Sequence, residues 1–230
     1  MASPSTMRAE RPRGSRTRYR TLVLGVAIVQ LLCATVSAAD VQVLVDQAFK
    51  AVDRGDAESE TARKREAYQE AVRDAEEAVR REESSAQAHY ALFCGLGRLT
   101  EMRGALGQML ALARLRRELD RTLELNPQHS EALAAKGEML LRLPRLLGGD
   151  AAEAERYLRQ SLVYDPTFWR ARVLLVQALL EQSRRDAAAA EARDILARID
   201  PHRHERAETL RLLAEMGESP PVATPTKGPP

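Results

Sequence analysis

The chain has 230 residues, of which 44% are hydrophobic, 30% charged and only 4% aromatic. Ala, Leu, Glu and Arg dominate, and because all four are strong helix formers, this composition favours helices and argues against a sheet protein. The net charge of +2 hides an asymmetry, since residues 1–38 hold six arginines and one glutamate. The remaining chain is slightly acidic, so it has no overall attraction for nucleic acid or anionic lipid.

The first 38 residues have the layout of a signal peptide. An arginine-rich stretch precedes 13 mostly apolar residues at 22–34, too short a run for a membrane span of ~20 residues. Small residues at Ser37 and Ala38 favour cleavage after Ala38 and export of the chain, to the periplasm or elsewhere. Three alternatives stay open: an uncleaved membrane anchor over residues 22–38 with its basic end in the cytoplasm, lipidation of Cys33, and an organelle transit peptide.

Cys33 and Cys94 are the two cysteines of the chain. If cleavage removes Cys33, Cys94 has no partner for a disulfide within the chain. We interpret Cys94 as a small buried apolar residue, with pairing between chains as the alternative.

Three similar helix endings recur at Pro127, Pro166 and Pro201, each preceded by Asn or Asp. Each proline disfavours helical geometry in the residue before it and so marks the end of one helix and the turn to the next. Ahead of them, residues 41–83 predict a short helix separated at Gly55 from a long charged helix over 57–81.

The stretches between these prolines each predict two helices. Residues 169–182 and 186–199 carry apolar residues at helical spacing. In the preceding stretch the helices are 130–143 and about 150–164, with a Pro- and Gly-containing break between them. Asp150 is expected to cap the second of these, and Glu153 to complete a capping box. Helix pairs of this size cannot bury their apolar faces alone, so they stack on neighbours.

Residues 130–137 and the series Ala154, Leu158 and Leu162 before Asp165-Pro166 resemble the two helices of a tetratricopeptide repeat, with Gly137 at its small-residue position. Residues 86–92 and 68–72 are similar to parts of other repeats. Lys136 and Phe93 depart from the pattern. The insertion at 143–150 further resembles the T-component of tripartite ATP-independent periplasmic transporters and its relatives.

The resemblance implies an all-α fold of stacked antiparallel helix pairs, a tetratricopeptide-repeat superhelix of about four repeats plus a terminal helix at 204–216. The repeat domain is expected over residues 39–217, with its clearest repeats at 128–166 and 167–201. Residues 218–230 hold five prolines and predict a disordered tail. Gly137 is expected in a tight contact between helices. Lys136, at an inward position, is expected to reach solvent or pair with an acid.

No enzyme motif stands out. Gly148-Gly149 fits a turn better than a phosphate loop, and His202 and His204 point apart on a helix. His89 and His129 have no evident Asp or Ser partner at helical spacing, and the sequence offers no acid–base pair that can be placed in one cleft. The sequence therefore predicts a protein without catalytic activity, cofactor or metal.

Two surfaces are candidates for binding. Arg114, Arg117 and Arg121 share a helical face and, with Arg142 and Arg145, suit an anion or an acidic peptide, although Arg114 can also pair with Glu118 in an ordinary solvated face. The second candidate follows from the resemblance, which implies that the first helix of each pair lines a concave groove. Its expected binding residues are Tyr90, Cys94, Arg98, Glu131, Glu138, Arg142, Arg170 and Gln177.

The leading functional hypothesis is an exported, non-catalytic scaffold that binds a protein or peptide of the cell envelope in this groove. The alternative is a periplasmic accessory of a solute transporter that holds a small ligand in a closed apolar cavity. We expect no nucleic-acid partner, and membrane contact only through an uncleaved N-terminal segment. The oligomeric state stays open.

Overall fold

The computed structural model describes residues 39–219. The predicted signal segment, and the proline-rich tail from residue 220 onward, lie outside the described residues. Residue 218, expected to open a disordered tail, packs back on the fold. Its backbone N–H donates to the Leu213 carbonyl at 3.0 Å and its carboxylate pairs with Arg193.

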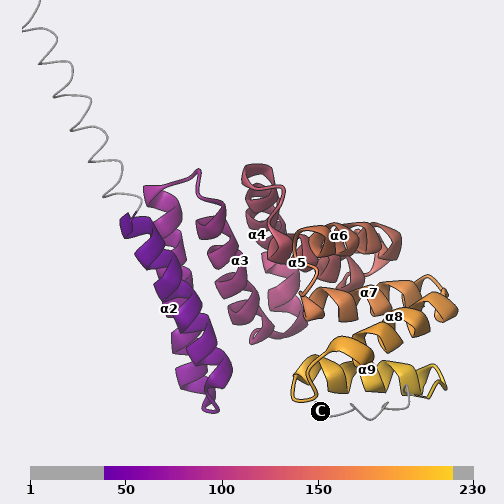
Figure 1. The fold of residues 1–230 in the computed structure, drawn as a ribbon. Helices are drawn as coiled ribbons and strands as arrows, with labels where there is room; N and C mark the ends of the chain where they lie inside the picture. Colours follow the sequence, from indigo (N-terminus) through magenta and orange to yellow (C-terminus); the bar gives the residue numbers. More distant parts are fainter. Residues whose placement is uncertain (1–38, 220–230) are drawn as a thin grey trace, which may run out of the picture.

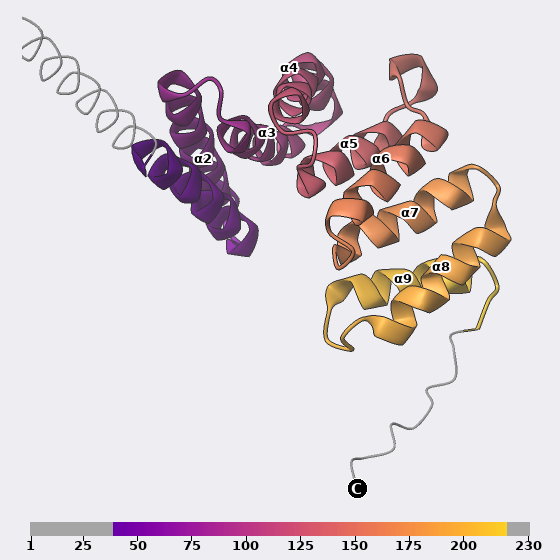
Figure 2. The same ribbon diagram turned by 45° about the horizontal axis from the view of Figure 1, so that its top comes forward.

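Between residues 39 and 219 every regular element is a helix. A first helix covers residues 39–57, and the rest follow in chain order: α2 Thr61–Arg81, α3 Ala86–Glu101, α4 Gly104–Leu125, α5 Ser130–Arg142, the short 3-10 helix η1 Arg145–Leu147, α6 Ala151–Tyr164, α7 Trp169–Glu181, α8 Arg185–Arg198 and α9 His204–Glu215. Successive helices lie side by side in one curved row (Figures 1 and 2). The predicted all-α fold of stacked helix pairs is confirmed.

Gly55 does not separate two helices as predicted. It lies inside the first helix, which continues to residue 57 before a break at 58–60. A Cβ on Gly55 would come within 2.4 Å of the Tyr68 ring on α2. The glycine therefore allows close packing of two helices, and the sequence alone did not distinguish this from a helix break.

The break between α5 and α6 is built by backbone conformation. Gly148 has φ +85°, which favours glycine, and a Cβ on Gly149 would collide with the Leu143 carbonyl. Asp150 caps α6 as predicted, accepting from the N–H groups of Ala152 and Glu153 at 2.8 and 3.0 Å. The predicted capping box is incomplete, because the Asp150 N–H donates instead to the Leu140 carbonyl.

Two large apolar clusters form the core. The N-terminal cluster joins the first helix to α2 and α3 through residues such as Val45, Ala75 and Leu92. The C-terminal cluster spans α5 to α9 and includes Leu158 and Leu175. The junction between them, where α4 meets α5, is the least extensive contact between successive α-helices from α2 to α9.

Polar and aromatic contacts hold this junction. The His129 ring lies 4.6 Å from that of Tyr90, measured between centroids, and its Nε2 is 3.1 Å from Gln87 Oε1. Lys136 on α5 pairs with Asp120 on α4, so the inward lysine has an acidic partner. These contacts run from α3 and α4 to α5 and to His129 just before it, and we call the set the α4/α5 junction.

Candidate functional site

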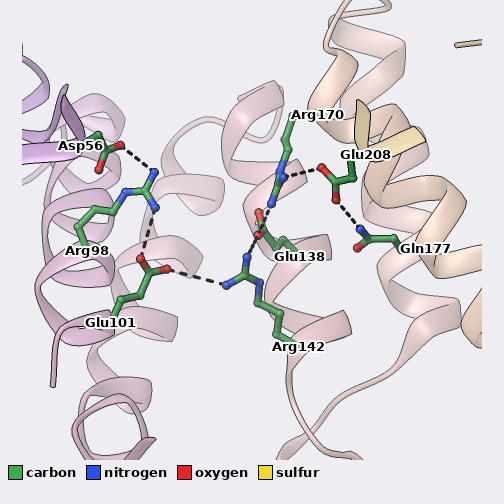
Figure 3. Close-up of polar contacts among 8 residues, drawn as sticks. All are labelled: Asp56, Arg98, Glu101, Glu138, Arg142, Arg170, Gln177 and Glu208. Atoms are coloured by element: carbon green, nitrogen blue, oxygen red, sulfur yellow. Dashed lines mark hydrogen bonds and ion pairs between the residues drawn. The ribbon is translucent and has the colours of Figure 1, made fainter. Parts of the chain in front are cut away.

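A continuous series of charged and polar side chains crosses the first helices of successive pairs. We call it the polar ladder (Figure 3). Its members come from the end of the first helix and from α3, α5, α7 and α9: Asp56, Arg98, Glu101, Glu138, Arg142, Arg170, Gln177 and Glu208.

The ladder begins where the first helix ends. Asp56 accepts from the Tyr68 hydroxyl at 2.6 Å through one oxygen and from Arg98 Nη2 at 2.9 Å through the other. Arg98 uses its second terminal nitrogen to reach Glu101, one turn further along α3, at 3.3 Å. Arg98 thus ties the first helix to α3, with its side chain still 44% exposed.

The ladder crosses the α4/α5 junction through Arg142. Its Nη1 lies 3.9 Å from the Glu101 carboxylate on α3, and its Nη2 lies 2.6 Å from Glu138 one turn back on α5. The Arg142 side chain is 64% exposed, the most exposed of the ladder's charged side chains. A partner that lies across the two halves would therefore meet this guanidinium first.

Glu138 continues the ladder into the C-terminal half. Its Oε1 also accepts from Arg170 Nη2 on α7 at 2.7 Å. Arg170 in turn reaches Glu208 on α9 at 3.4 Å, and Glu208 accepts from the Gln177 amide at 2.8 Å. Glu138 and Arg142 are four residues apart and therefore share one face of α5. Arg170 and Gln177 are seven residues apart and likewise share one face of α7.

Of the eight residues predicted to bind a partner, the structure brings five together in the ladder: Arg98, Glu138, Arg142, Arg170 and Gln177. Sequence reasoning missed Asp56, Glu101 and Glu208. Glu101 lies three residues after Arg98, and this spacing was the available signal. Asp56 was hidden by the wrong helix boundary at Gly55.

Tyr90 and Cys94 are not free groove residues. The Tyr90 ring lies 6.1 Å from those of Phe49 and Phe93, in an aromatic cluster that also includes His129. Burial raises the pKa of the Tyr90 hydroxyl well above its ordinary value. Burial likewise raises the pKa of the Cys94 thiol, to about 11. Cys94 is partly exposed, so the prediction of a fully buried side chain was wrong, although the raised pKa disfavours the reactive thiolate form.

Glu131 contacts a histidine rather than the ladder. Its carboxylate lies 3.1 Å from His129 Nδ1. This hydrogen bond lowers the pKa of the Glu131 carboxyl to about 2, against the opposing effect of partial burial. The pair helps to fix the His129 ring at the α4/α5 junction.

A second surface feature is an open groove of about 1050 Å³ between α2 and α4, with residues of α3 at its floor. It brings together the predicted set Arg114, Arg117 and Arg121, but not Arg142 or Arg145, which lie elsewhere. Acidic side chains line it equally, and Arg114 pairs with Glu76 at 2.5 Å. The mixed charge argues against a dedicated anion site here.

His89 and Glu118 form a buried pair at this groove. His89 Nδ1 lies 2.8 Å from the Glu118 carboxylate, and Nε2 lies 3.0 Å from the Glu83 carbonyl. The expectation that no acid–base pair shares a cleft was wrong, because these residues are 29 positions apart and meet only in the fold. Both ring nitrogens face protein acceptors, so neither offers a free lone pair to a substrate. The pair thus links α3 to α4 and has a structural role.

The sequence model of the family described as Regulator of microtubule dynamics protein 1-3 matches residues 20–140. The match starts ahead of the described residues, ends within α5 and covers more than half of the chain. The chain belongs to this family. This match includes the first helix, α2, α3, α4 and most of α5, and with them Asp56, Arg98, Glu101 and Glu138 of the ladder.

This family replaces the one expected from the sequence. Assignment to the tetratricopeptide-repeat family, and to the T-component of tripartite ATP-independent periplasmic transporters within it, is wrong, because the matching family is a different one. The resemblance rested on small and apolar residues at helix contacts and on Asp-Pro helix endings. Those features report how two antiparallel helices pack, and unrelated families of stacked helices share them.

No curated protein gives a significant match to the chain. Among the described helices, none combines the length and the apolar character needed to cross a bilayer.

Proposed function

We propose that the protein is a non-catalytic scaffold that binds a segment of a protein partner along the polar ladder. The observation that carries this proposal is the continuity of the ladder across the first helices of every pair from the first helix to α9. Side chains held in register along stacked helices offer an extended partner several contacts at once, and arginine guanidiniums can exchange one carboxylate for another without losing their donors.

The ladder suits a partner segment that carries charges of both signs. Arginines and carboxylates alternate along it, and Arg98, Glu101 and Arg142 keep 44%, 48% and 64% of their side chains exposed. Exposed charges of this kind favour specificity and fast association over tight affinity. Binding is therefore expected to weaken as the salt concentration rises.

The family description supports a protein partner. A regulator of microtubule dynamics acts on a protein polymer, and this makes polymerised tubulin the first defined partner to test. Export, predicted from residues 1–38, would instead place the scaffold among envelope proteins. An exported chain would not meet tubulin. The location of the chain in the cell therefore decides between a tubulin partner and an envelope-protein partner.

A solute-binding role has less support. Such a role needs an enclosed apolar cavity, whereas the ladder is polar and exposed and the groove between α2 and α4 is open and lined by charges. His89 contacts Glu118 and the Glu83 carbonyl through its two ring nitrogens. This occupied imidazole likewise supports a binding role rather than a catalytic one.

The test is co-sedimentation of the full chain with polymerised tubulin, together with crosslinking capture from an extract of the native cell. The ladder variant is Arg98→Ala/Arg142→Ala. The matched control is Arg156→Ala/Arg159→Ala, which removes two arginines of similar exposure from α6.

The ladder variant is expected to lose about tenfold or more in capture of the partner, while the control binds like wild type, because two guanidinium contacts of ordinary strength are removed. Loss confined to tubulin sedimentation would identify the polymer as the partner. Loss confined to one captured protein would identify that protein instead. Equal binding by all three chains would show that the ladder is not the partner site.

A further inference from the structure

The first turns of α4 expose three large apolar side chains. Leu106, Met109 and Leu110 are 70%, 59% and 79% exposed. Their spacing of three and four residues places them on one face of the helix. The other face of α4 packs against α3 and buries residues such as Leu119. Three adjacent exposed side chains of this size on a surface helix mark an interaction site.

Basic residues frame this apolar face, and no acidic residue occurs from position 102 to position 117. Arg103 directly precedes α4, and its side chain lies beside Gly107 in the first turns of the helix. Arg117 lies seven residues after Leu110, so it occupies the same side of α4 as the apolar face. Within residues 39–219, neither Arg103 nor Arg117 has an acidic side chain within ion-pair distance. Arg117 also lines the rim of the mixed-charge groove between α2 and α4, but neither guanidinium is engaged in an ion pair with a described residue, so both can contact a ligand.

The short helix η1, which also carries exposed leucine and arginine side chains, is hydrogen-bonded to α4. Arg116 donates to the Leu147 carbonyl of η1. In η1, Leu146 is 99% exposed and Arg145 is also exposed. No acidic residue occurs from position 140 to position 149. Exposed leucines and unopposed arginines thus come from two segments that the fold brings together.

We propose that this surface, made of Arg103, the exposed side of α4 as far as Arg117, and η1, binds the face of an anionic membrane. The leucines and Met109 would enter the boundary between headgroups and acyl chains, and the arginines would contact lipid phosphates. A basic helix with exposed apolar side chains is typical of peripheral membrane binding. A protein partner would be expected to meet charged groups of both signs, as the ladder provides.

The local charge explains why composition did not predict this surface. Residues after position 38 carry a slight acidic excess, so attraction to anionic lipid arises from the segregation of arginines on one surface. The surface belongs to a second helix of a pair, whereas the ladder belongs to first helices. Membrane binding and partner binding are therefore separate properties, and either can fail without the other.

The test is sedimentation of the full chain with vesicles of phosphatidylcholine alone or mixed with phosphatidylserine. Leu106→Ser/Leu110→Ser is expected to lower the affinity for mixed vesicles by about tenfold or more, since each apolar side chain inserted contributes on the order of a kcal/mol. The matched control is Val43→Ser/Val163→Ser, which alters exposed apolar residues elsewhere. The N-terminal apolar segment is the same in every chain, so its contribution cancels.

Charge is tested separately. Arg103→Gln/Arg117→Gln is expected to lower binding to mixed vesicles roughly thirtyfold and to leave binding to phosphatidylcholine unchanged, because each arginine near an anionic surface contributes about 1 kcal/mol. Arg65→Gln/Arg73→Gln, on α2, is the control.

Equal binding by all variants would overturn the proposal. So would light scattering that shows a dimer dispersed by Leu106→Ser/Leu110→Ser, since the surface would then be a contact between copies of the chain.

Discussion

Gly137 on α5 lies directly against Leu158 on α6. A Cβ at position 137 would come within 2.7 Å of Leu158 Cγ and 3.2 Å of the Ala154 carbonyl oxygen. Leu158 is fully buried in the C-terminal cluster, so other apolar side chains surround it. The predicted tight contact at Gly137 is thereby confirmed, and it brings the backbones of α5 and α6 close together.

Gly137→Leu is expected to destabilise the protein by ~1–3 kcal/mol, because the added side chain overpacks this contact. The measurement is urea unfolding followed by circular dichroism. Gly97→Ala on α3 is the control, since a Cβ there meets nothing within 4 Å. In a helix interior this change is expected to stabilise by ~0.5–1 kcal/mol. Equal effects of the two changes would show that the α5/α6 contact is looser than described.

Glu131→Gln is expected to lower stability at neutral pH by about 0.5 kcal/mol, a modest value because the Glu131 side chain is 52% exposed. The pKa of this carboxyl falls to about 2 in the folded chain, from an ordinary 4.5. Its stabilising effect is therefore present above pH 4.5 and is lost as the pH falls toward 2. Unfolding curves of the two chains should converge over that interval. A difference that persists at the acidic end of it would contradict the assignment.

The fold was largely predictable because helix formation and helix ends depend on local sequence. Pro127, Pro166 and Pro201 each mark a turn, and the apolar spacing between them gave the helices correctly. The error at Gly55 has a physical origin, since a glycine that admits the Tyr68 ring and a glycine that breaks a helix look identical in sequence. Three dimensions were needed to tell them apart.

The candidate site was predictable only in part, because spacing within one helix can be read from the sequence and pairing between helices cannot. Arg98, Glu138 and Arg142 share helical faces that can be read from spacing. Their partners on other helices cannot be read this way, because Arg170 and Glu208 are 38 positions apart. His89 and Glu118 were missed for the same reason. Pairing across stacked helices depends on the rotation of each helix, and local pattern does not fix it.

Tyr68→Phe is expected to destabilise the protein by ~1 kcal/mol at neutral pH, because it removes the hydrogen bond from the Tyr68 hydroxyl to Asp56. Burial, followed by this bond, raises the pKa of Tyr68 from 10.0 to about 12. The stabilising effect is complete below pH 10 and is lost as the pH rises toward 12. Wild type should therefore lose stability over this interval more steeply than Tyr68→Phe, as measured by urea unfolding in alkaline buffers. Parallel pH profiles would show that the hydroxyl is not bonded in solution.

Because the core is divided into two apolar clusters, we expect a destabilising substitution in one cluster to leave the helices of the other cluster folded. Leu175→Ala, at a side chain 2% exposed in the C-terminal cluster, is expected to cost ~2–5 kcal/mol. In stacked helices each pair contacts its neighbours alone, and the α4/α5 junction between the clusters is mostly polar. Amide hydrogen exchange should therefore speed up in α7, α8 and α9 while α2 keeps its protection. Leu92→Ala, in the N-terminal cluster, should give the reverse pattern. If either change accelerated exchange equally in α2 and α8, the chain would unfold as one cooperative unit, and the junction would couple the halves more strongly than its contacts indicate.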